Sequence, residues 1–351
     1  MGLKRRFAID VARLPVGAKN LITDVPGVQV GHATINKENI HTGVTAILPH
    51  TENLFLEKVP AAVHVINGFG KSAGLIQVDE LGTIETPILL TNTLSVPMAS
   101  HALIKYMLQE NIEIGRTTGT VNPLVLECND GAINDIRALA VEEAHIIEAL
   151  QAADSTFMEG DLGAGTGMRA FGLKGGIGSS SRCITINGKS HTLGALVLSN
   201  FGLRENLLVD GNPVGVTINE YLKNQIEAKE QGSIIVILAT DVPLSARQLK
   251  RVAKRAGIGI GRTGGFAGNG SGEIAIAFST AARIPHFPQQ AFFEYEVLHD
   301  DYMDLLFAAT VSAVEESIIS SLYHAHSQYD RSNQKCFSLK EILREMELPL
   351  F

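Results

Sequence analysis

Short apolar runs bounded by glycine recur along this chain, and they constrain its fold more than any other feature. The runs cover residues 43–48, 62–66, 194–199, 233–239 and 274–278. Several of them are apolar at consecutive positions, which predicts strands that are buried on both faces. A sheet made of such strands must be covered on each side by helices or by a second sheet.

Candidate helices alternate with these strands. Apolar residues at helical spacing predict helices over residues 138–153, 244–256 and 300–325, of which the second ends at Gly257 and the third is the longest. A polar stretch follows the third helix and predicts a loop before a short final helix near residues 339–346. This alternation of strands and helices is typical of an α/β fold.

We expect residues 1–351 to form a single large domain, because no proline- or serine-rich linker divides the chain. A net charge of −8 leaves no basic surplus for binding nucleic acid or an anionic membrane. The three cysteines are far apart and lack CxxC spacing, which predicts neither a disulfide framework nor a zinc site and favours a cytoplasmic location. The N-terminal residues predict no signal peptide, and no run predicts a membrane span.

Neither a cofactor nor a metal is expected from the motifs. Gly163-Ala-Gly-Thr-Gly has GxGxG spacing and lacks the acidic residue that a dinucleotide site places after its next strand. The eleven histidines form no HxH or HExxH pattern.

One serine has the surroundings of a nucleophile. Gly268-Asn269-Gly270-Ser271-Gly272-Glu273 stands directly before the last apolar run. Gly270 has no Cβ, so the Gly270–Ser271 peptide can adopt a strained conformation in which the Ser271 hydroxyl reaches the preceding carbonyl. An N→O acyl shift and hydrolysis would leave Ser271 as a new N-terminus with a hydroxyl nucleophile and an α-amino base, whose unperturbed pKa is about 7.7–8.0. The structural alternative is a glycine-rich turn with an exposed serine.

Nine separate blocks, in order, give the chain a resemblance to the self-processing L-aminopeptidase/D-Ala-esterase (DmpA-type) family, which includes the β-peptidyl aminopeptidases. The resemblance extends from about residue 20 to about residue 323 and is specific because the blocks agree together. The blocks are residues 21–32, 42–45, 67–70, 85–93, 163–168, 174–178, 199–202, 239–244 and 269–272.

This resemblance implies a four-layer α/β/β/α sandwich and cleavage at Gly270–Ser271 into an α chain of residues 1–270 and a β chain of residues 271–351. It also implies a serine aminopeptidase that releases N-terminal residues from short peptides, amides or esters through an acyl-enzyme, and a homo-tetramer. Two alternatives remain open. One is an acyltransferase of the ornithine acetyltransferase type, whose new N-terminus is typically threonine, and the other is a non-catalytic module of the same fold.

Asn200 is our first candidate for an oxyanion donor. It ends the predicted strand 194–199, and a fixed N–H at the end of a strand can stabilise a tetrahedral oxyanion. Asn269 and the backbone N–H groups of the glycine-rich loop are alternative donors. An asparagine that closes a strand through an Asx-turn is the structural alternative.

Glu315 is our candidate for orienting the nucleophile. It lies on an apolar stripe of the longest predicted helix, where a carboxylate is costly unless it is paired, and the α-ammonium of a cleaved Ser271 would pair it. The family resemblance implies a serine two positions before this acid, whereas this chain has Ala313, so we expect Ser312 or Thr310 to replace the missing hydroxyl through a water. The structural alternative is a buried glutamate paired with an arginine.

A polar cluster after another apolar run gives a candidate site for the substrate ammonium. Glu127-Cys-Asn-Asp130 is followed by Asn134-Asp135, and a carboxylate there would pair with the amine of an aminopeptidase substrate. The structural alternative is a surface turn. Cys128 has no histidine placed to activate it, which favours a buried thiol over a nucleophile.

Overall fold

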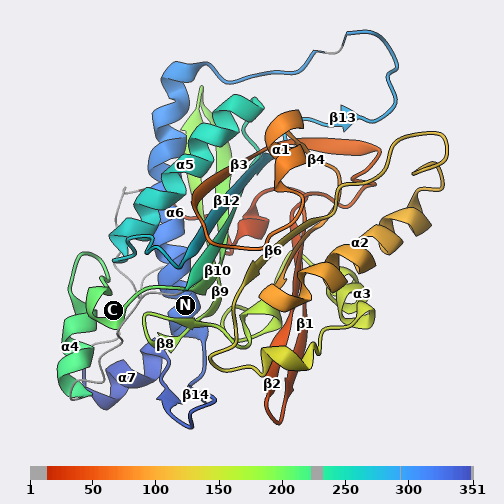
Figure 1. Ribbon diagram of the computed structural model, residues 1–351. Coiled ribbons are helices and arrows are strands. Elements are labelled where there is room, and N and C mark those ends of the chain that lie inside the picture. The colour runs from red at the N-terminus through yellow and green to blue at the C-terminus, as the bar shows by residue number, and fades with distance from the viewer. Residues whose placement is uncertain (1–13, 223–231, 293, 349–351) are drawn as a thin grey trace.

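The computed structural model in Figure 1 describes residues 14–222, 232–292 and 294–348. Two sheets and seven α-helices make up most of the described chain. The N-terminal stretch on which we based the absence of a signal peptide, residues 1–13, lies outside the described residues.

The smaller sheet has four strands in the order β1-β2-β5-β6. In the larger sheet of seven strands, the neighbours follow the order β13-β3-β12-β11-β10-β9, and β4 also pairs with β3. Two pairs of neighbours, β5 with β6 and β11 with β12, are parallel. The strands of the smaller sheet are β1 Gln29–Lys37, β2 Ile40–Leu48, β5 Ile88–Asn92 and β6 Leu124–Cys128. Those of the larger sheet are β3 Glu57–Gly68, β4 Thr83–Ile84, β9 Gly176–Ile186, β10 Lys189–Asn200, β11 Ser233–Thr240, β12 Gly272–Ser279 and β13 Ile284–Pro285.

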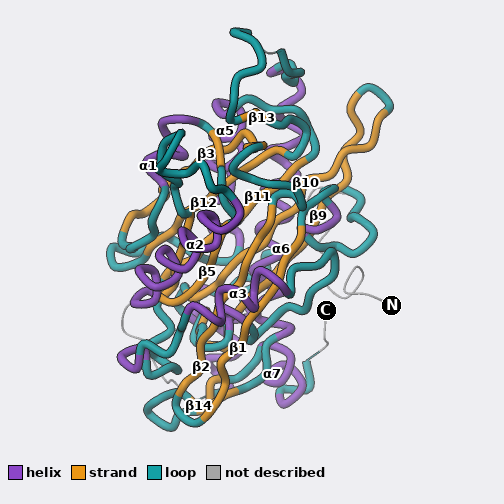
Figure 2. Tube along the Cα trace, turned by 90° about the vertical axis from the view of Figure 1, so that its right-hand side faces the viewer, coloured by secondary structure: helices purple, strands orange, loops and turns teal. Residues whose placement is uncertain are grey.

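The helices cover the outer faces of both sheets, as Figures 1 and 2 show. One hydrophobic core lies between the larger sheet and helices α5 and α6, a second between the two sheets, and a third between the smaller sheet and helices α2 and α3. The order of layers is therefore helix, sheet, sheet, helix, which confirms the predicted α/β/β/α sandwich. The helices are α1 Leu75–Leu81, α2 Val96–Glu110, α3 Glu143–Gln151, α4 Val214–Tyr221, α5 Ala246–Arg262, α6 Met303–His324 and α7 Leu339–Glu345.

Strand β12 shows why its sequence is apolar at consecutive positions. Ile274, Ile276 and Phe278 face the core between the sheets, while Ala275 and Ala277 face α5 and α6. Side chains alternate across a strand, so both faces of β12 are buried, as predicted. This central position gives the residues at the start of β12 rigid neighbours on both sides.

Helix α6 is mostly apolar and is buried around nearly its whole circumference, including its two glutamates Glu315 and Glu316. In the described part of the chain, the segment Asp300–His324 alone is a helix long and apolar enough to cross a membrane, yet 78% of its apolar window is buried inside the fold. A mostly apolar helix that is packed inside a protein is a core helix. The predicted helix over residues 300–325 is confirmed, with its first turn in 3₁₀ form.

The predicted end of the second helix at Gly257 is wrong, because α5 continues to Arg262. Its continuation is explained by Gly259, where an added Cβ would lie 2.7 Å from Val314 Cβ. A glycine there lets α5 approach α6 closely, which outweighs the low helix propensity of glycine. The prediction of a helix from residue 138 is also wrong at its start, since Leu139 is left-handed with φ 50° and α3 begins at Glu143.

The C-terminal region follows the predicted order of a polar stretch and a short helix. The polar stretch contains a small hairpin of β14 Gln328–Tyr329 and β15 Lys335–Cys336, and helix α7 follows it. Another small hairpin, β7 Arg169–Ala170 with β8 Leu173–Lys174, lies before β9.

Candidate active site

Ser271 lies in a turn directly before β12 and is fully buried. Its backbone N–H donates to Gly268 O at 3.0 Å, and Ser271 Oγ donates to the same oxygen at 2.9 Å. The glycine-rich turn that we considered as the structural alternative is present, but its serine is not exposed. Within this loop Ala267 is left-handed with φ 53°, a conformation that a residue with a Cβ rarely adopts.

Two side chains that we did not predict from the sequence contact this turn. The Glu273 carboxylate forms a short hydrogen bond with Ser271 Oγ, and Glu273 is fully buried. Asn67 Nδ2, from the end of β3, donates to Gly268 O at 2.8 Å and to Ser271 O at 2.5 Å. We call Ser271, Glu273 and Asn67 the Ser271 cluster. Residues two apart in a strand share a face, so the spacing of Ser271 and Glu273 was a signal that could have identified this contact.

Asn200 is the last residue of β10 and lies at the same end of the strands of the larger sheet as Ser271. Asn200 pairs with Ser233 on β11, and Ser233 pairs with Gly272 at the start of β12. Its carboxamide joins two backbone groups, accepting from Arg169 N and donating to Asn129 O, each at 2.9 Å. The role of Asn200 as an oxyanion donor stays a prediction.

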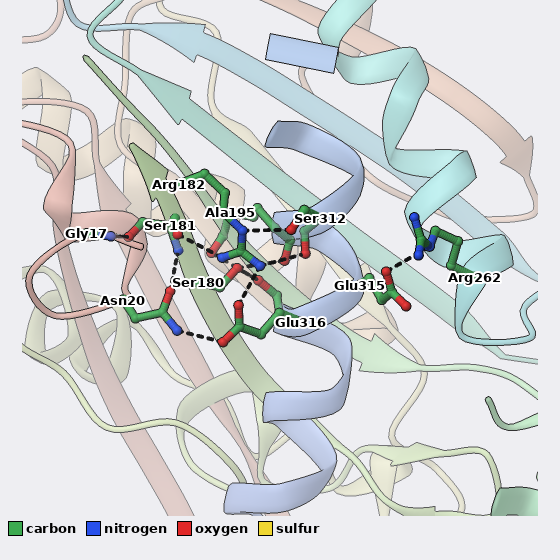
Figure 3. Close-up of polar contacts among 12 residues, drawn as sticks. Gly17, Asn20, Ser180, Ser181, Arg182, Ala195, Arg262, Ser312, Glu315 and Glu316 are labelled. Carbon is green, nitrogen blue, oxygen red and sulfur yellow. Dashed lines mark hydrogen bonds and ion pairs between the residues drawn. The ribbon is translucent and has the colours of Figure 1, made fainter. Parts of the chain in front are cut away.

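Glu315 contacts an arginine in this structure. Glu315 is buried on α6, and Glu315 Oε2 lies 2.9 Å from Arg262 Nε at the end of α5 (Figure 3). Burial raises the pKa of the Glu315 carboxyl, and the Arg262 guanidinium opposes that rise. Arg262 is followed by the loop that leads to Ser271, so this ion pair anchors the start of the loop. The catalytic role of Glu315 stays a prediction.

The next residue on α6, Glu316, belongs to a separate buried network (Figure 3). Arg182 Nη2 lies 2.6 Å from Glu316 Oε2, and Asn20 Nδ2 donates to Glu316 Oε1 at 2.7 Å. Arg182 Nε also donates to Ser312 Oγ at 2.7 Å. We call Arg182, Glu316, Asn20 and Ser312 the Arg182 cluster.

The hydroxyls that we expected to replace the one missing at Ala313 have other partners. Ser312 Oγ accepts from Arg182, and Thr310 Oγ1 donates to Leu306 O of its own helix at 2.7 Å. A threonine that bonds the carbonyl four residues earlier is common in helices. The structure therefore gives neither Ser312 nor Thr310 a contact with Ser271 or Glu315.

The carboxylates of Glu127 and Asp130 are buried, so the surface-turn interpretation is wrong for these two residues, although Asn129 between them is exposed beside a turn. Glu127 and Asp130 are 4% and 0% exposed, respectively. Glu127 Oε1 accepts from Lys71 N at 2.8 Å, and its other oxygen accepts from Thr93 Oγ1. An added Cβ on Gly70 would lie 3.3 Å from Glu127 Oε1 and 3.9 Å from Ile274 Cδ1, which places this carboxylate near the start of β12.

Burial also changes the pKa of two side chains near Glu127. Burial raises the pKa of the Asp130 carboxyl to about 6, although Asn134 Nδ2 donates to it at 3.0 Å. Burial also raises the pKa of the Cys128 thiol, whose Sγ donates to Leu198 O at 3.5 Å. A thiol held in this way is unreactive, which agrees with a structural role for Cys128.

Comparison with known proteins identifies relatives along almost the whole chain. The sequence pattern of Peptidase family S58 matches residues 20–336. The beta-peptidyl aminopeptidase BapA of Sphingosinicella microcystinivorans is 38% identical over 343 residues, which cover 92% of this chain and 85% of that protein.

Solved structures show the same similarity. The PH0078 protein from Pyrococcus horikoshii OT3 is 52% identical with a TM-score of 0.89, covering 95% of this chain and 96% of that one. The L-aminopeptidase D-Ala-esterase/amidase from Ochrobactrum anthropi, described as a prototype for the serine aminopeptidases and a new variant among the Ntn hydrolase fold, is 37% identical. Its TM-score is 0.86, with 96% of this chain and 98% of that chain covered.

Proposed function

This chain belongs to peptidase family S58 and is a serine aminopeptidase of the N-terminal-nucleophile hydrolase type, and from this premise we propose that it activates itself by cleavage at Gly270–Ser271. The mature enzyme then removes N-terminal residues from short peptides, amides or esters through an acyl-enzyme on Ser271. The observation that carries this proposal is the buried Ser271 hydroxyl, held against a carboxylate at the start of the central strand β12.

The proposed cleavage converts the turn into a catalytic centre. The Ser271 N–H, which now donates to Gly268 O at 3.0 Å, would become an α-amine on the same residue as the nucleophile. An amine with a pKa near neutrality takes the hydroxyl proton directly or through one water. Asn200, at the same sheet edge, would then donate to the oxyanion of the acyl-transfer step.

The Glu127 carboxylate supports an aminopeptidase rather than an enzyme that acts on blocked substrates. It is buried near the start of β12, where it would pair with the ammonium group of a bound substrate. A substrate without that ammonium would leave the carboxylate uncompensated and bind poorly. On the resemblance alone, we also propose that the enzyme is a homo-tetramer located in the cytoplasm. Sedimentation of the purified enzyme would test the tetramer, which should have a mass four times 37.6 kDa.

Hydrolysis of aminoacyl p-nitroanilides tests the proposed function. Anilides of small residues such as D-alanine or β-alanine should be cleaved with no added acceptor, and Ser271→Ala should abolish this activity. The N-acetylated anilides are the matched control and should be poor substrates, because they lack the ammonium that Glu127 would bind. Activity that requires an amine acceptor, such as acetyl transfer from N-acetyl-ornithine to glutamate, would contradict an aminopeptidase.

A further inference from the structure

We propose that Glu273 is the proton acceptor for the Ser271 hydroxyl when the Gly270–Ser271 bond is cleaved. This inference rests on the proposed function and adds to it a catalytic residue for the maturation step. It divides the acidic residues of the site between two tasks, with Glu273 serving self-cleavage and Glu315 predicted to serve the mature enzyme.

The strand geometry places Glu273 beside the reacting oxygen. Ser271 and Glu273 are two residues apart, so their side chains leave the same face of the chain, and the carboxylate contacts Ser271 Oγ directly. Glu273 is paired with Ile234 on β11 and with Asn67 on β3. Strands therefore hold the Glu273 backbone on both sides, with a register shift on the β3 side between Glu273 and Ile274.

Asn67 holds Ser271, the other partner of the contact with Glu273. Its amide donates to the carbonyl oxygens of Gly268 and Ser271, which lie on either side of the bond to be cleaved. These two hydrogen bonds hold the turn so that the Ser271 side chain stays against Glu273. A base and a nucleophile held within hydrogen-bond distance meet the geometric requirement for general base catalysis.

Burial makes this contact more effective than the same contact in water. Ser271 and Glu273 are both fully buried, so bulk water does not compete for the hydroxyl proton. Electrostatic interactions and hydrogen bonds are stronger where the surroundings have a low dielectric constant. The single Ser271 hydroxyl proton has two neighbouring acceptors, Gly268 O at 2.9 Å and the closer Glu273 carboxylate, and only the carboxylate is basic enough to remove it.

Two proton transfers accompany the proposed acyl shift from nitrogen to oxygen. The Ser271 Oγ–H proton passes to the Glu273 carboxylate while Oγ bonds to the Gly270 carbonyl carbon. The tetrahedral intermediate then breaks its C–N bond, and the proton on Glu273 passes to the released Ser271 nitrogen. The product is a Gly270–Ser271 ester, which one water hydrolyses to the Gly270 carboxylate and the free Ser271 hydroxyl.

The test follows cleavage after a short pulse of cell-free synthesis, using the full chain. Glu273→Gln keeps the size of the side chain and removes its ability to accept a proton, so cleavage should slow by about 10²-fold or more. Glu273→Asp moves the carboxylate back by one methylene and should slow cleavage by about 10-fold. Glu159→Gln is the matched control, because Glu159 is a partly buried glutamate that also contacts a serine, with Ser320 Oγ donating to it at 2.6 Å, and the cleavage rate of this variant should be unchanged.

Hydroxylamine identifies the step at which Glu273 acts. It cleaves an accumulated ester, so it would restore cleavage of Glu273→Gln if the carboxylate were needed only for ester hydrolysis. We expect no restoration, since the acyl shift itself should be blocked, and restoration would overturn the proposal. Glu273→Gln that is cleaved within about threefold of the wild-type rate would also overturn it.

Folding and the proposed function are checked separately. Circular dichroism and the melting temperature should show that unprocessed Glu273→Gln is folded. If it is not, Glu273→Asp decides, and a folded Asp variant with an unchanged rate would count against the proposal. A wild-type chain that is never cleaved would instead contradict the proposed function, whereas a cleaved wild type with an unaffected Gln variant contradicts only the role of Glu273.

Discussion

The Ser271 cluster and the Arg182 cluster both bury a glutamate against the larger sheet, but they provide it with different partners. Glu316 contacts the Arg182 guanidinium, while Glu273 contacts the Ser271 hydroxyl. A guanidinium remains protonated at any ordinary pH, so its contact holds structure and transfers no proton. A hydroxyl beside a carboxylate provides a route for its proton. The partner of each carboxylate, more than its burial, therefore separates a structural site from a reactive one.

The two clusters also differ in which segments they join. The Ser271 cluster lies within β3 and the start of β12, whereas the Arg182 cluster joins the segment around Asn20, strand β9 and helix α6 (Figure 3). After the proposed cleavage, Arg182 and Asn20 would belong to one chain and Glu316 to the other. The Arg182 cluster would then link the two chains without a covalent bond.

Removing the arginine should have the largest effect on stability. Arg182→Met leaves Glu316 buried and uncompensated, which should lower the free energy of unfolding by about 3–5 kcal/mol. Urea unfolding in the Ser271→Ala background measures this on a single, uncleaved chain. The same substitution in the wild-type background should leave the rate of self-cleavage within about twofold in protein that folds. A large loss of cleavage with unchanged stability would contradict the structural assignment of this cluster.

Removing the Asn200 amide should act on turnover instead. Asn200→Ala should lower turnover of an aminoacyl p-nitroanilide by about 10²–10³-fold, as expected for loss of one oxyanion donor. Steady-state kinetics on fully cleaved enzyme measures this effect without interference from maturation. Normal turnover together with a lower melting temperature would show that the amide only joins the Arg169 and Asn129 backbone groups.

Two neighbouring glutamates on α6, Glu315 and Glu316, allow a catalytic and a structural role to be compared on one helix. Glu315→Gln should lower turnover by about 10²-fold if the residue orients the mature Ser271 amine. Glu316→Gln is the control on the same helix and should reduce stability while turnover per folded molecule stays near normal. Equal turnover in both variants would remove Glu315 from the mechanism and leave its ion pair with Arg262 as its role.

The smallest predicted effect is a dependence of stability on pH. Burial raises the pKa of Glu159 from 4.5 to about 7, although hydrogen bonds from Ser320 and from Ser179 N–H oppose the rise. Between these values the folded chain holds a proton that the unfolded chain has lost, so the free energy of unfolding falls as the pH rises from about 4.5 to about 7. Glu159→Gln should remove this contribution, which is at most about 1.4 kcal/mol for each pH unit.

Urea unfolding of the Ser271→Ala chain with and without Glu159→Gln, over this pH range, measures the difference. The two stability curves should diverge as the pH rises, with the Gln variant becoming relatively more stable. Parallel curves would mean that Glu159 does not hold a proton in the folded state.

The layers of the fold were predictable from the sequence because the signal was local. Consecutive apolar residues in β12 identify a strand covered on both sides, and apolar residues at helical spacing identify α6 as the longest helix. The end of α5 was not predictable, since the reason why the helix continues past Gly257 is the close approach of Val314, more than fifty residues later. The competing helix-breaking tendency of glycine is local and misled the prediction.

The candidate site was predictable in part. The glycine-flanked Ser271 and the strand-ending Asn200 are local patterns, and the structure places both at one sheet edge. Asn67 reaches the turn from a strand about two hundred residues earlier, and only the pairing of β3 with β12 reveals it. The Glu315 partner was left open between an ammonium and an arginine, and the uncleaved chain has the arginine.

The mass of the purified protein, with N-terminal sequencing of any fragment, shows directly whether Gly270–Ser271 is cleaved. We expect two chains, residues 1–270 and 271–351, the second beginning Ser-Gly-Glu-Ile, while Ser271→Ala remains at 37.6 kDa. A wild-type protein that remains a single chain of 37.6 kDa yet hydrolyses aminoacyl p-nitroanilides would contradict an N-terminal nucleophile at Ser271. So would a Ser271→Ala chain that is still cleaved after Gly270.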